Sequence, residues 1–288
     1  MAATDQIVAI DEPCVIYDLP ELDYHADPVA AGSLSSTEAK LILDCPAVLK
    51  WRRAHGEPPK DSYDFGHVVH GLVLGAGMPV EVIPEEILST TGAATTKEAK
   101  DFKAAARAEG KIPIKQDEYD RAVACAAAAT NAPGLSKIFA NGRPEVSVFA
   151  PDPDTGVWMR GRIDWVTTIV GKTILVDVKT TPSANPAEFS RQAARYDYAL
   201  QREWYRAIWA ATHDGTLPDF VHIVVSKTEP YLACIVDMDE SYAAVGQAKM
   251  RRALAVYAEC QATGQWPGYN TRVHTISPPA YYTAYEED

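Results

Sequence analysis

The sequence has few cysteines, and they are not spaced for a disulfide framework or a zinc site. Cys14, Cys45, Cys125, Cys234 and Cys260 are odd in number, and no two of them form a CxxC pair. A framework of disulfides needs an even number of cysteines, and a zinc site built on CxxC pairs needs closely spaced thiolates. We therefore expect reduced thiols that mostly pack in the interior.

Long apolar runs are also missing. Charged residues, Pro or Gly interrupt every apolar stretch before it reaches the roughly 18 residues of a membrane-spanning helix. The N-terminal stretch "MAATDQIVAIDEPC" lacks the basic region followed by an apolar one that marks a secretory leader. These absences predict a soluble, cytoplasmic protein with no membrane partner.

Basic residues are in the minority. The chain has 27 Lys and Arg against 39 Asp and Glu, and a formal net charge of −12. This balance excludes a protein coated in basic surface, although an acidic protein can still contain a local basic channel. With 288 residues and 47% hydrophobic content, the chain is long enough for one domain with a substantial core.

The residue pattern divides the chain into an arm and a single domain. Residues 1–32 lack periodicity and predict an irregular arm. Within one domain over 33–288, we expect a helical cap over 33–143, a catalytic core over 144–270 and a tail over 271–288.

Helical signals dominate the cap. In "SSTEAKLILDCPAVLKWRRA", Ser35 or Ser36 is placed as N-cap, Glu38 suits a capping box and Pro46 begins a second helix. Another helix is predicted over "DSYDFGHVVHGLVLG", then an exposed loop over 77–96 and two Ala-rich helices.

After Pro144 the period changes from 3.6 to 2. The segments "EVSVFAP", "VWMRGRIDWVTTIV" and "TILVDVKTT" predict three strands of an antiparallel meander. One long helix from "NPAEF" to "THDG", the strands "FVHIVVSKT" and "YLACIVDMD", and a helix over 240–263 follow. The fold class is therefore α/β, with a mixed sheet of about five strands flanked by helices.

Two carboxylates and a lysine stand out in "GRIDWVTTIVGKTILVDVKTT", residues 161–181. Alternate strand residues point to one face, so Asp177 and Lys179 share a face. With Asp164 on the preceding strand, two carboxylates can hold one divalent cation, which is the equipment for phosphodiester hydrolysis. A surface ion pair would explain the same residues. Charges within "ILVDVK", however, are costly to bury without a partner or a metal.

Other polar residues are candidates for contact with DNA. Gln201 and Tyr205 share a helix face and could contact a phosphate or order the lysine, although Tyr205 could equally pack in the core. Arg160 and Arg162 share a strand face with Asp164 and could contact DNA phosphate or pair with that carboxylate.

A helix end also carries cations beside an aromatic ring. Trp51, Arg52 and Arg53 suit a DNA end or a terminal phosphate. A solvated helix terminus, where cations favour the macrodipole, explains the same residues.

Asp164 followed by "VDVKT" resembles the PD-(D/E)xK nuclease superfamily. Four further segments are similar to its RecB and RecE branch, which includes exonuclease VIII and lambda exonuclease: "LSSTEAKLILDCPAVLKW", "FGHVVHGLVLG", "PEVSVF" and "QREWYRA". The resemblance covers roughly residues 33–270. It implies a restriction-endonuclease-like sheet with an N-terminal helical cap that closes one side of a metal cleft.

The resemblance also implies residue roles. Asp164, Asp177 and the Val178 backbone carbonyl would be metal ligands, with Lys179 as the catalytic lysine. His70 would approach the same ion from a helix, and its imidazole would make Mn²⁺ a good substitute for Mg²⁺. The alternative is a His70 packed at the surface, and His67 is a second candidate one turn away.

Glu145 resembles a carboxylate that holds a second metal, or is an ordinary residue at the start of a strand. Ser36 joins the DNA-binding candidates through the first similar segment. Some relatives carry an iron–sulfur cluster, but only Cys260 stands near the C-terminus where three cysteines are needed, so we expect no cluster.

The resemblance implies a Mg²⁺-dependent exonuclease that resects linear double-stranded DNA from 5′ to 3′ in phage-type recombination. It also implies DNA ends and a single-strand annealing protein as partners, a ring-shaped homo-oligomer, and a phage or prophage origin in a bacterial host. The alternatives are a single-strand exonuclease or an endonuclease of the same superfamily, and a non-catalytic DNA-binding protein that retains the fold.

Overall fold

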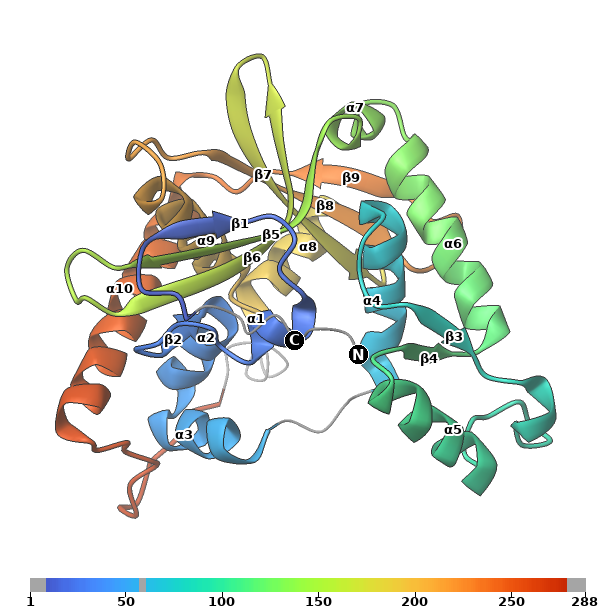
Figure 1. The fold of residues 1–288 in the computed structure, drawn as a ribbon, viewed down its shortest axis with the longest axis horizontal. Helices are drawn as coiled ribbons and strands as arrows, with labels where there is room; N and C mark the ends of the chain where they lie inside the picture. The colour runs from blue at the N-terminus through green and yellow to red at the C-terminus, as the bar shows by residue number, and fades with distance from the viewer. Residues whose placement is uncertain (1–8, 57–60, 279–288) are drawn as a thin grey trace, which may run out of the picture.

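A computed structural model of the protein describes residues 9–56 and 61–278. Its centre is a seven-stranded sheet in the order β1-β5-β6-β7-β8-β9, with β2 paired to β6, and β3 and β4 form a separate pair (Figure 1). The strands are β1 (Cys14–Ile16), β2 (Ser33–Ser35), β3 (Val80–Val82), β4 (Ile112–Ile114), β5 (Gly142–Pro151), β6 (Trp158–Ile169), β7 (Lys172–Thr181), β8 (Asp219–Ser226) and β9 (Ala233–Val236). The helices are α1 (Glu21–His25), α2 (Ser36–Asp44), α3 (Pro46–His55), α4 (Asp61–Leu74), the 3-10 turn η1 (Glu85–Ile87), α5 (Lys97–Ala108), α6 (Gln116–Asn131), α7 (Leu135–Phe139), α8 (Pro186–Arg195), α9 (Tyr198–Ala211) and α10 (Glu240–Thr263).

The predicted mixed sheet flanked by helices is confirmed, and the five strands expected from the sequence are β5 to β9. Strands β5, β6 and β7 form the antiparallel meander. The turn between β6 and β7 places Val170 and Gly171 at positive φ, as a two-residue hairpin turn requires. Strand β8 is parallel to β7, which needs the crossover that α8 and α9 provide, and β9 returns antiparallel.

The described part of the N-terminal segment, from residue 9, is not the irregular arm expected for 1–32. Strand β1 pairs with β5, and Tyr24 of α1 lies over Phe149 of β5 in a small apolar cluster. Strand β2 then pairs in parallel with β6. Strands of three residues carry too little pattern to predict, because distant partners fix them. Residues 1–8 lie outside the described residues.

Helices cover both faces of the sheet. On one face α2, α9 and α10 pack around Trp204 and onto Leu175 of β7. On the other face α4, α6 and α7 pack onto Val176. Because side chains alternate along a strand, Asp177 and Lys179 point toward the layer of α2 and α9.

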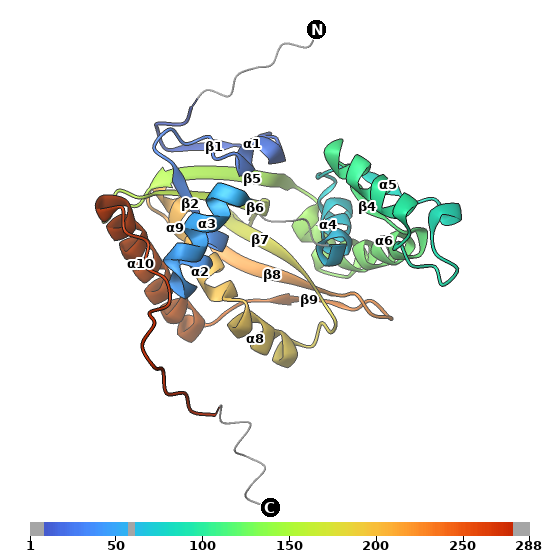
Figure 2. The same ribbon diagram turned by 90° about the horizontal axis from the view of Figure 1, so that it is seen from below.

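The predicted helical cap is divided between the two faces of the sheet. Figures 1 and 2 show α2 and α3 beside α10 on one side of the molecule, and α4 to α6 with β4 on the other. The expected start signals of α2 and α3 are confirmed: Ser35 and Glu38 form a capping box, and Pro46 begins α3. Residues 77–96, expected to be a loop, include β3 and η1.

The long helix expected after β7 is two helices. Asp197 lies between α8 and α9 with a φ of 52°, in the left-handed region that ends a helix. Its carboxylate is ion-paired with Lys249 of α10, which helps to hold this turn. The break is hard to predict because Asp adopts this conformation without a glycine to announce it.

The chain after α10 has no regular structure as far as it is described. Pro267 accepts a hydrogen bond from the Ala47 backbone at 3.1 Å, so this stretch lies against α3. The tail predicted for 271–288 falls outside the described residues from 279 onward. Among the helices that the structure describes, none has the length and apolar character needed to cross a membrane.

Candidate active site

The site lies where β6 and β7 separate. Their antiparallel ladder ends at the pair Trp165 and Val176, so Asp164 and Asp177 follow directly beyond it. There the Val178 N–H donates to Asp164 Oδ2 at 2.7 Å in place of a strand partner. The N–H and C=O of one strand residue point to the same side, so the Val178 carbonyl faces this gap as well.

Glu145 enters the site through an unusual backbone conformation. Its φ of 52° is left-handed, and the register of β5 and β6 passes from Pro144 and Trp165 to Val146 and Ile163 without pairing it. A residue other than glycine rarely adopts this conformation, and such strain collects at functional sites. The irregularity releases Glu145 from the ladder beside Asp164.

His70 of α4 joins two of the carboxylates. Its Nδ1 lies 3.2 Å from Glu145 Oε1, and its Nε2 lies 2.9 Å from Asp164 Oδ2. Burial alone would lower the pKa of His70, but Asp164 and Glu145 outweigh it and raise the pKa to about 10. Arg162 binds the other Glu145 oxygen rather than Asp164, and its expected DNA contact stays a prediction. His67 is exposed. The His70 imidazole is therefore a cation that two carboxylates hold in place.

The second half of the site surrounds Asp177. Its Oδ1 accepts hydrogen bonds from Lys179 Nζ at 2.7 Å and from Gln201 Nε2 at 2.9 Å. Gln201 also lies 3.4 Å from the Tyr205 hydroxyl, and Tyr205 is buried. Burial would lower the pKa of Lys179, but the carboxylates of Asp177 and Asp164 raise it overall. Lys179 is therefore an ammonium fixed beside a buried carboxylate.

A further residue of this half was not found from the sequence. His222 of β8 is fully buried and stands opposite Asp177 in the parallel register, with Nε2 3.8 Å from Asp177 Oδ2. Among the described residues neither of its ring nitrogens has a hydrogen-bond partner, while that Asp177 oxygen lies 2.7 Å from Lys179 Nζ. Burial lowers the pKa of His222 to about 4, so it is neutral. A histidine inside "FVHIVV" points to the site only once the register of β8 is known.

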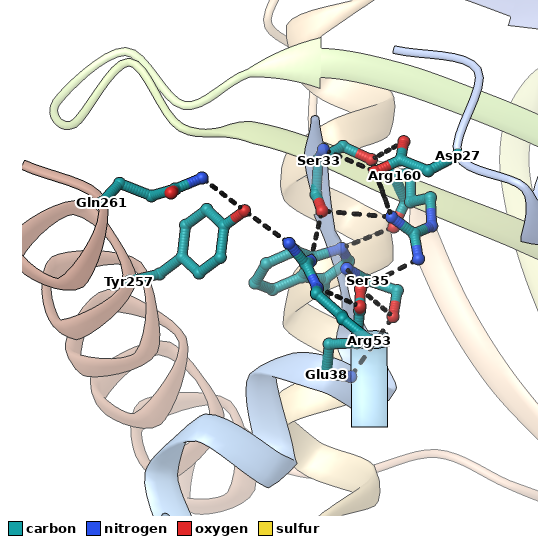
Figure 3. Close-up of polar contacts among 9 residues, drawn as sticks. Asp27, Ser33, Ser35, Glu38, Arg53, Arg160, Tyr257 and Gln261 are labelled. Carbon is teal, nitrogen blue, oxygen red and sulfur yellow. Dashed lines mark hydrogen bonds and ion pairs between the residues drawn. The ribbon is translucent and has the colours of Figure 1, made fainter. Parts of the chain in front are cut away.

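Arg160 pairs with Asp27 and Glu38 and not with Asp164, which corrects one of its two expected roles, while its contact with DNA stays a prediction. It is nearly buried, with Nη1 3.0 Å from Asp27 Oδ2 and Nη2 2.9 Å from Glu38 Oε2 (Figure 3). Arg53 Nε donates to the other Glu38 oxygen at 2.8 Å. We call Asp27, Ser33, Ser35, Glu38, Arg53 and Arg160 the anchor network, because it joins the N-terminal segment, α2, α3 and β6.

The remaining predicted DNA contacts are also placed away from the carboxylates. Ser36 is buried in the first turn of α2, so it presents little surface to a ligand. Arg52 lies in the last turn of α3, where Trp51 is 57% exposed and stacks on His55. Arg53, in the same turn of α3, belongs to the anchor network and therefore has a structural role.

The donor chemistry of the site fits a hard divalent cation. Within residues 9–56 and 61–278, no three His, Cys, Asp or Glu side chains are arranged closely enough to hold a metal ion. The candidate donors nevertheless gather here: Asp164, Asp177, Glu145 and His70. Lys179 Nζ lies 2.7 Å from each Asp177 oxygen, and His70 contacts both Asp164 and Glu145. Carboxylate oxygens and an imidazole are donors that a divalent cation accepts.

The sequence profile of the family described as "PDDEXK-like domain of unknown function (DUF3799)" matches residues 35–277, so the chain belongs to this family. This match spans α2 to the end of the described tail and includes every candidate site residue. Membership places the protein in the PD-(D/E)xK nuclease superfamily, as the motifs predicted.

Solved structures with the same fold include a provisionally assigned exonuclease of Eubacterium rectale. The two chains superpose with a TM-score of 0.60 and share 12% of their residues, over 94% of this chain and 98% of that one. At this identity the likeness shows the fold alone. No curated protein matches the sequence.

Proposed function

We propose that the protein is a metal-dependent DNA exonuclease. The observation that carries this proposal is the pair of buried Asp177 and half-buried Lys179, which lies where two strands separate, next to the group of Asp164, Glu145 and His70. A buried carboxylate is costly unless it is paired or coordinates a metal. The membership in a PDDEXK-like family supports the same chemistry.

The proposed division of labour follows the contacts. Asp164, Asp177 and the Val178 carbonyl would hold a divalent metal, with His70 as a further ligand and Glu145 supporting a second ion. Such a metal, preferably Mg²⁺ with Mn²⁺ as a substitute, supplies an activated water and offsets charge on the phosphate. As a ligand, His70 would bind the metal through a neutral ring nitrogen, and the metal would share the Asp177 carboxylate with Lys179.

Lys179 then acts on the reacting phosphate. Its ammonium stays within reach of the developing negative charge, which it stabilises while water attacks phosphorus and the phosphodiester oxygen leaves. Gln201 keeps Asp177 oriented through its hydrogen bond at 2.9 Å, and the buried Tyr205 supports Gln201. The contact between helix α9, which carries Gln201 and Tyr205, and strand β7, which carries Asp177, therefore orients this carboxylate.

The finer proposal is 5′ to 3′ resection of linear double-stranded DNA in phage-type recombination. It rests on the resemblance to the RecB and RecE branch. With it come a ring-shaped homo-oligomer, a single-strand annealing partner and a cytoplasmic setting in a bacterial host. A ring with an acidic exterior and a basic lumen would reconcile DNA binding with the net charge of −12.

End-labelled DNA tests this proposal. The wild type is incubated with a linear duplex labelled at the 5′ or the 3′ end, and with a covalently closed circle, in Mg²⁺, Mn²⁺ or EDTA. We expect the 5′-labelled nucleotide to be the first product released from the linear duplex, and only when metal is present. The closed circle should remain intact. Cleavage of the circle would replace exonuclease with endonuclease, and digestion of single strands alone would exclude duplex resection. Binding without cleavage in any metal would indicate a non-catalytic protein.

A further inference from the structure

A second lysine reaches the site from the N-terminal helix. Lys40 lies in α2 and is partly buried, with its Nζ 5.4 Å from the centre of the Tyr198 ring. Lys179 Nζ lies 5.0 Å from the centre of the same ring. Segments far apart in the sequence thus bring two ammonium groups to one aromatic side chain at the start of α9.

The anchor network fixes the helix that carries Lys40. The Ser35 hydroxyl accepts a hydrogen bond from the Glu38 N–H at 3.2 Å, and the Glu38 carboxylate accepts from the Ser35 N–H at 3.0 Å. The same carboxylate is bound by Arg53 and by Arg160 of β6 (Figure 3). Lys40 follows Glu38 by two residues, so its position relative to the sheet is set by this network.

The charges around Lys40 leave room for an anion. Burial and the charge of Lys179 lower the pKa of Lys40 to about 8, although Asp177 and Asp197 act in the opposite direction. In the described part of the chain no carboxylate forms an ion pair with Lys40, while Asp177 is paired with Lys179 and Asp197 with Lys249. Lys179 is thus compensated by Asp177, whereas Lys40 has no paired carboxylate in that part of the chain, so an anion near the Tyr198 ring would be its charge partner.

We propose that Lys40 and Lys179, which both contact the Tyr198 ring, bind backbone phosphates of the DNA strand that is being cleaved. Lys179 serves the reacting phosphate, and Lys40 binds a non-bridging oxygen of the strand through a charge-assisted hydrogen bond. A phosphodiester carries one negative charge, which suits an ammonium used as a point charge. This inference rests on the proposed nuclease function and extends its substrate site to α2.

Equilibrium binding to a duplex in Ca²⁺ or EDTA tests the inference separately from cleavage. The variants are Lys40→Gln, Lys40→Met, which keeps the apolar stem, and Lys40→Arg, which keeps the charge. Lys172→Gln is the matched control: its side chain is 76% exposed, and it lies on the same strand as Lys179 but about 23 Å away along β7. Circular dichroism and thermal melting of each variant show that the comparison concerns folded protein.

We expect Lys40→Gln and Lys40→Met to bind DNA about tenfold more weakly, with Lys40→Arg and Lys172→Gln close to wild type. The slope of log affinity against log salt should fall by about one ion for the two neutral variants. In cleavage, KM should rise while kcat changes little, which a merely structural role would not produce.

Two results separate the claims. Wild-type affinity and salt slope in both neutral variants would overturn the role of Lys40 and leave the nuclease proposal intact. A wild type that binds no DNA would overturn the proposed function together with this inference.

Discussion

Two clusters of half-buried charges lie on the same sheet, and they are built differently. In the anchor network every oxygen of Asp27 and Glu38 is used, and Arg160 binds both carboxylates. In the active site, as far as the chain is described, His70 binds Asp164, Lys179 binds Asp177, and the one arginine, Arg162, binds only Glu145 among the carboxylates. Each cluster contains one residue other than glycine at positive φ, Asp27 in the anchor network and Glu145 in the active site.

The difference separates charges that hold the fold from charges that can change partners. Arginine stays protonated and binds carboxylates in a fixed fork, so the anchor network has one stable arrangement. Histidine and lysine exchange protons and bind as point charges, so a metal can replace them. Substitutions in the two clusters should therefore affect different properties: activity in one, and stability in the other.

The largest expected effect is on catalysis, from Asp177→Asn. We expect kcat for duplex hydrolysis to fall by about 10³-fold or more, about 4 kcal/mol, because an amide oxygen is a poor ligand for a hard cation. The change in stability should be smaller than the loss of activity, since Lys179 loses its ion pair but the asparagine still accepts from Gln201. Rates under saturating Mg²⁺ and a thermal melt measure both. A variant that retains its activity would remove Asp177 from the metal site.

The next effect is on stability, from Arg160→Met. Removing this cation leaves Asp27 and Glu38 without their shared partner, so the free energy of unfolding should fall by about 3 kcal/mol. Denaturant unfolding measures it, with Lys172→Met, at an exposed pair 4.0 Å apart, as the control expected to change by under about 1 kcal/mol. Activity below the melting transition should persist. Loss of activity in a fully folded Arg160→Met would break the division between the clusters.

A smaller, pH-dependent effect is expected from Glu38→Gln. Burial alone would raise the pKa of Glu38, but Arg160 and Arg53 bring it below its ordinary 4.5. A lowered pKa stabilises the folded chain fully above pH 4.5 and loses that contribution as the pH falls through the folded-state pKa. We expect a loss of about 2 kcal/mol at pH 7. The difference from wild type should shrink below pH 4.5, and equal curves at every pH would contradict the pairing.

The smallest expected effect is on stability, from His222→Leu in the active site. His222→Leu removes two buried nitrogens without partners, so the free energy of unfolding at pH 7 should rise by about 1 kcal/mol. Activity should fall a fewfold, because Asp177 loses the neighbour that lies 3.8 Å away. Melting curves measure the gain in stability, and initial rates measure the loss of activity. A less stable and fully active His222→Leu would assign it a purely structural role.

The sequence predicted the parts of the fold that depend on local pattern. Strong alternation marked β5 to β7, and the same alternation placed Asp177 and Lys179 on one side of β7. Short strands such as Cys14–Ile16 and the left-handed turn at Asp197 left no such pattern, because distant contacts determine them.

The candidate site was predictable to the same extent. Its motif residues stand on strands and helices with clear signals, and the structure brings His70, Glu145 and Asp164 together. Lys40 and His222 were missed because their closeness to the site depends on helix packing and on the register of a parallel strand. Arg160 has the right residue type near the motif, yet its partners come from the N-terminal segment, which the pattern did not reveal.

The most direct test is single-turnover hydrolysis of a linear duplex by the wild type and by Lys179→Ala, each with Mg²⁺ and with EDTA. The account predicts cleavage by the wild type only with metal, and a rate about 10³-fold lower in folded Lys179→Ala, because the charge beside the reacting phosphate is gone. Equal rates for the two proteins, or wild-type cleavage that persists in EDTA, would contradict it.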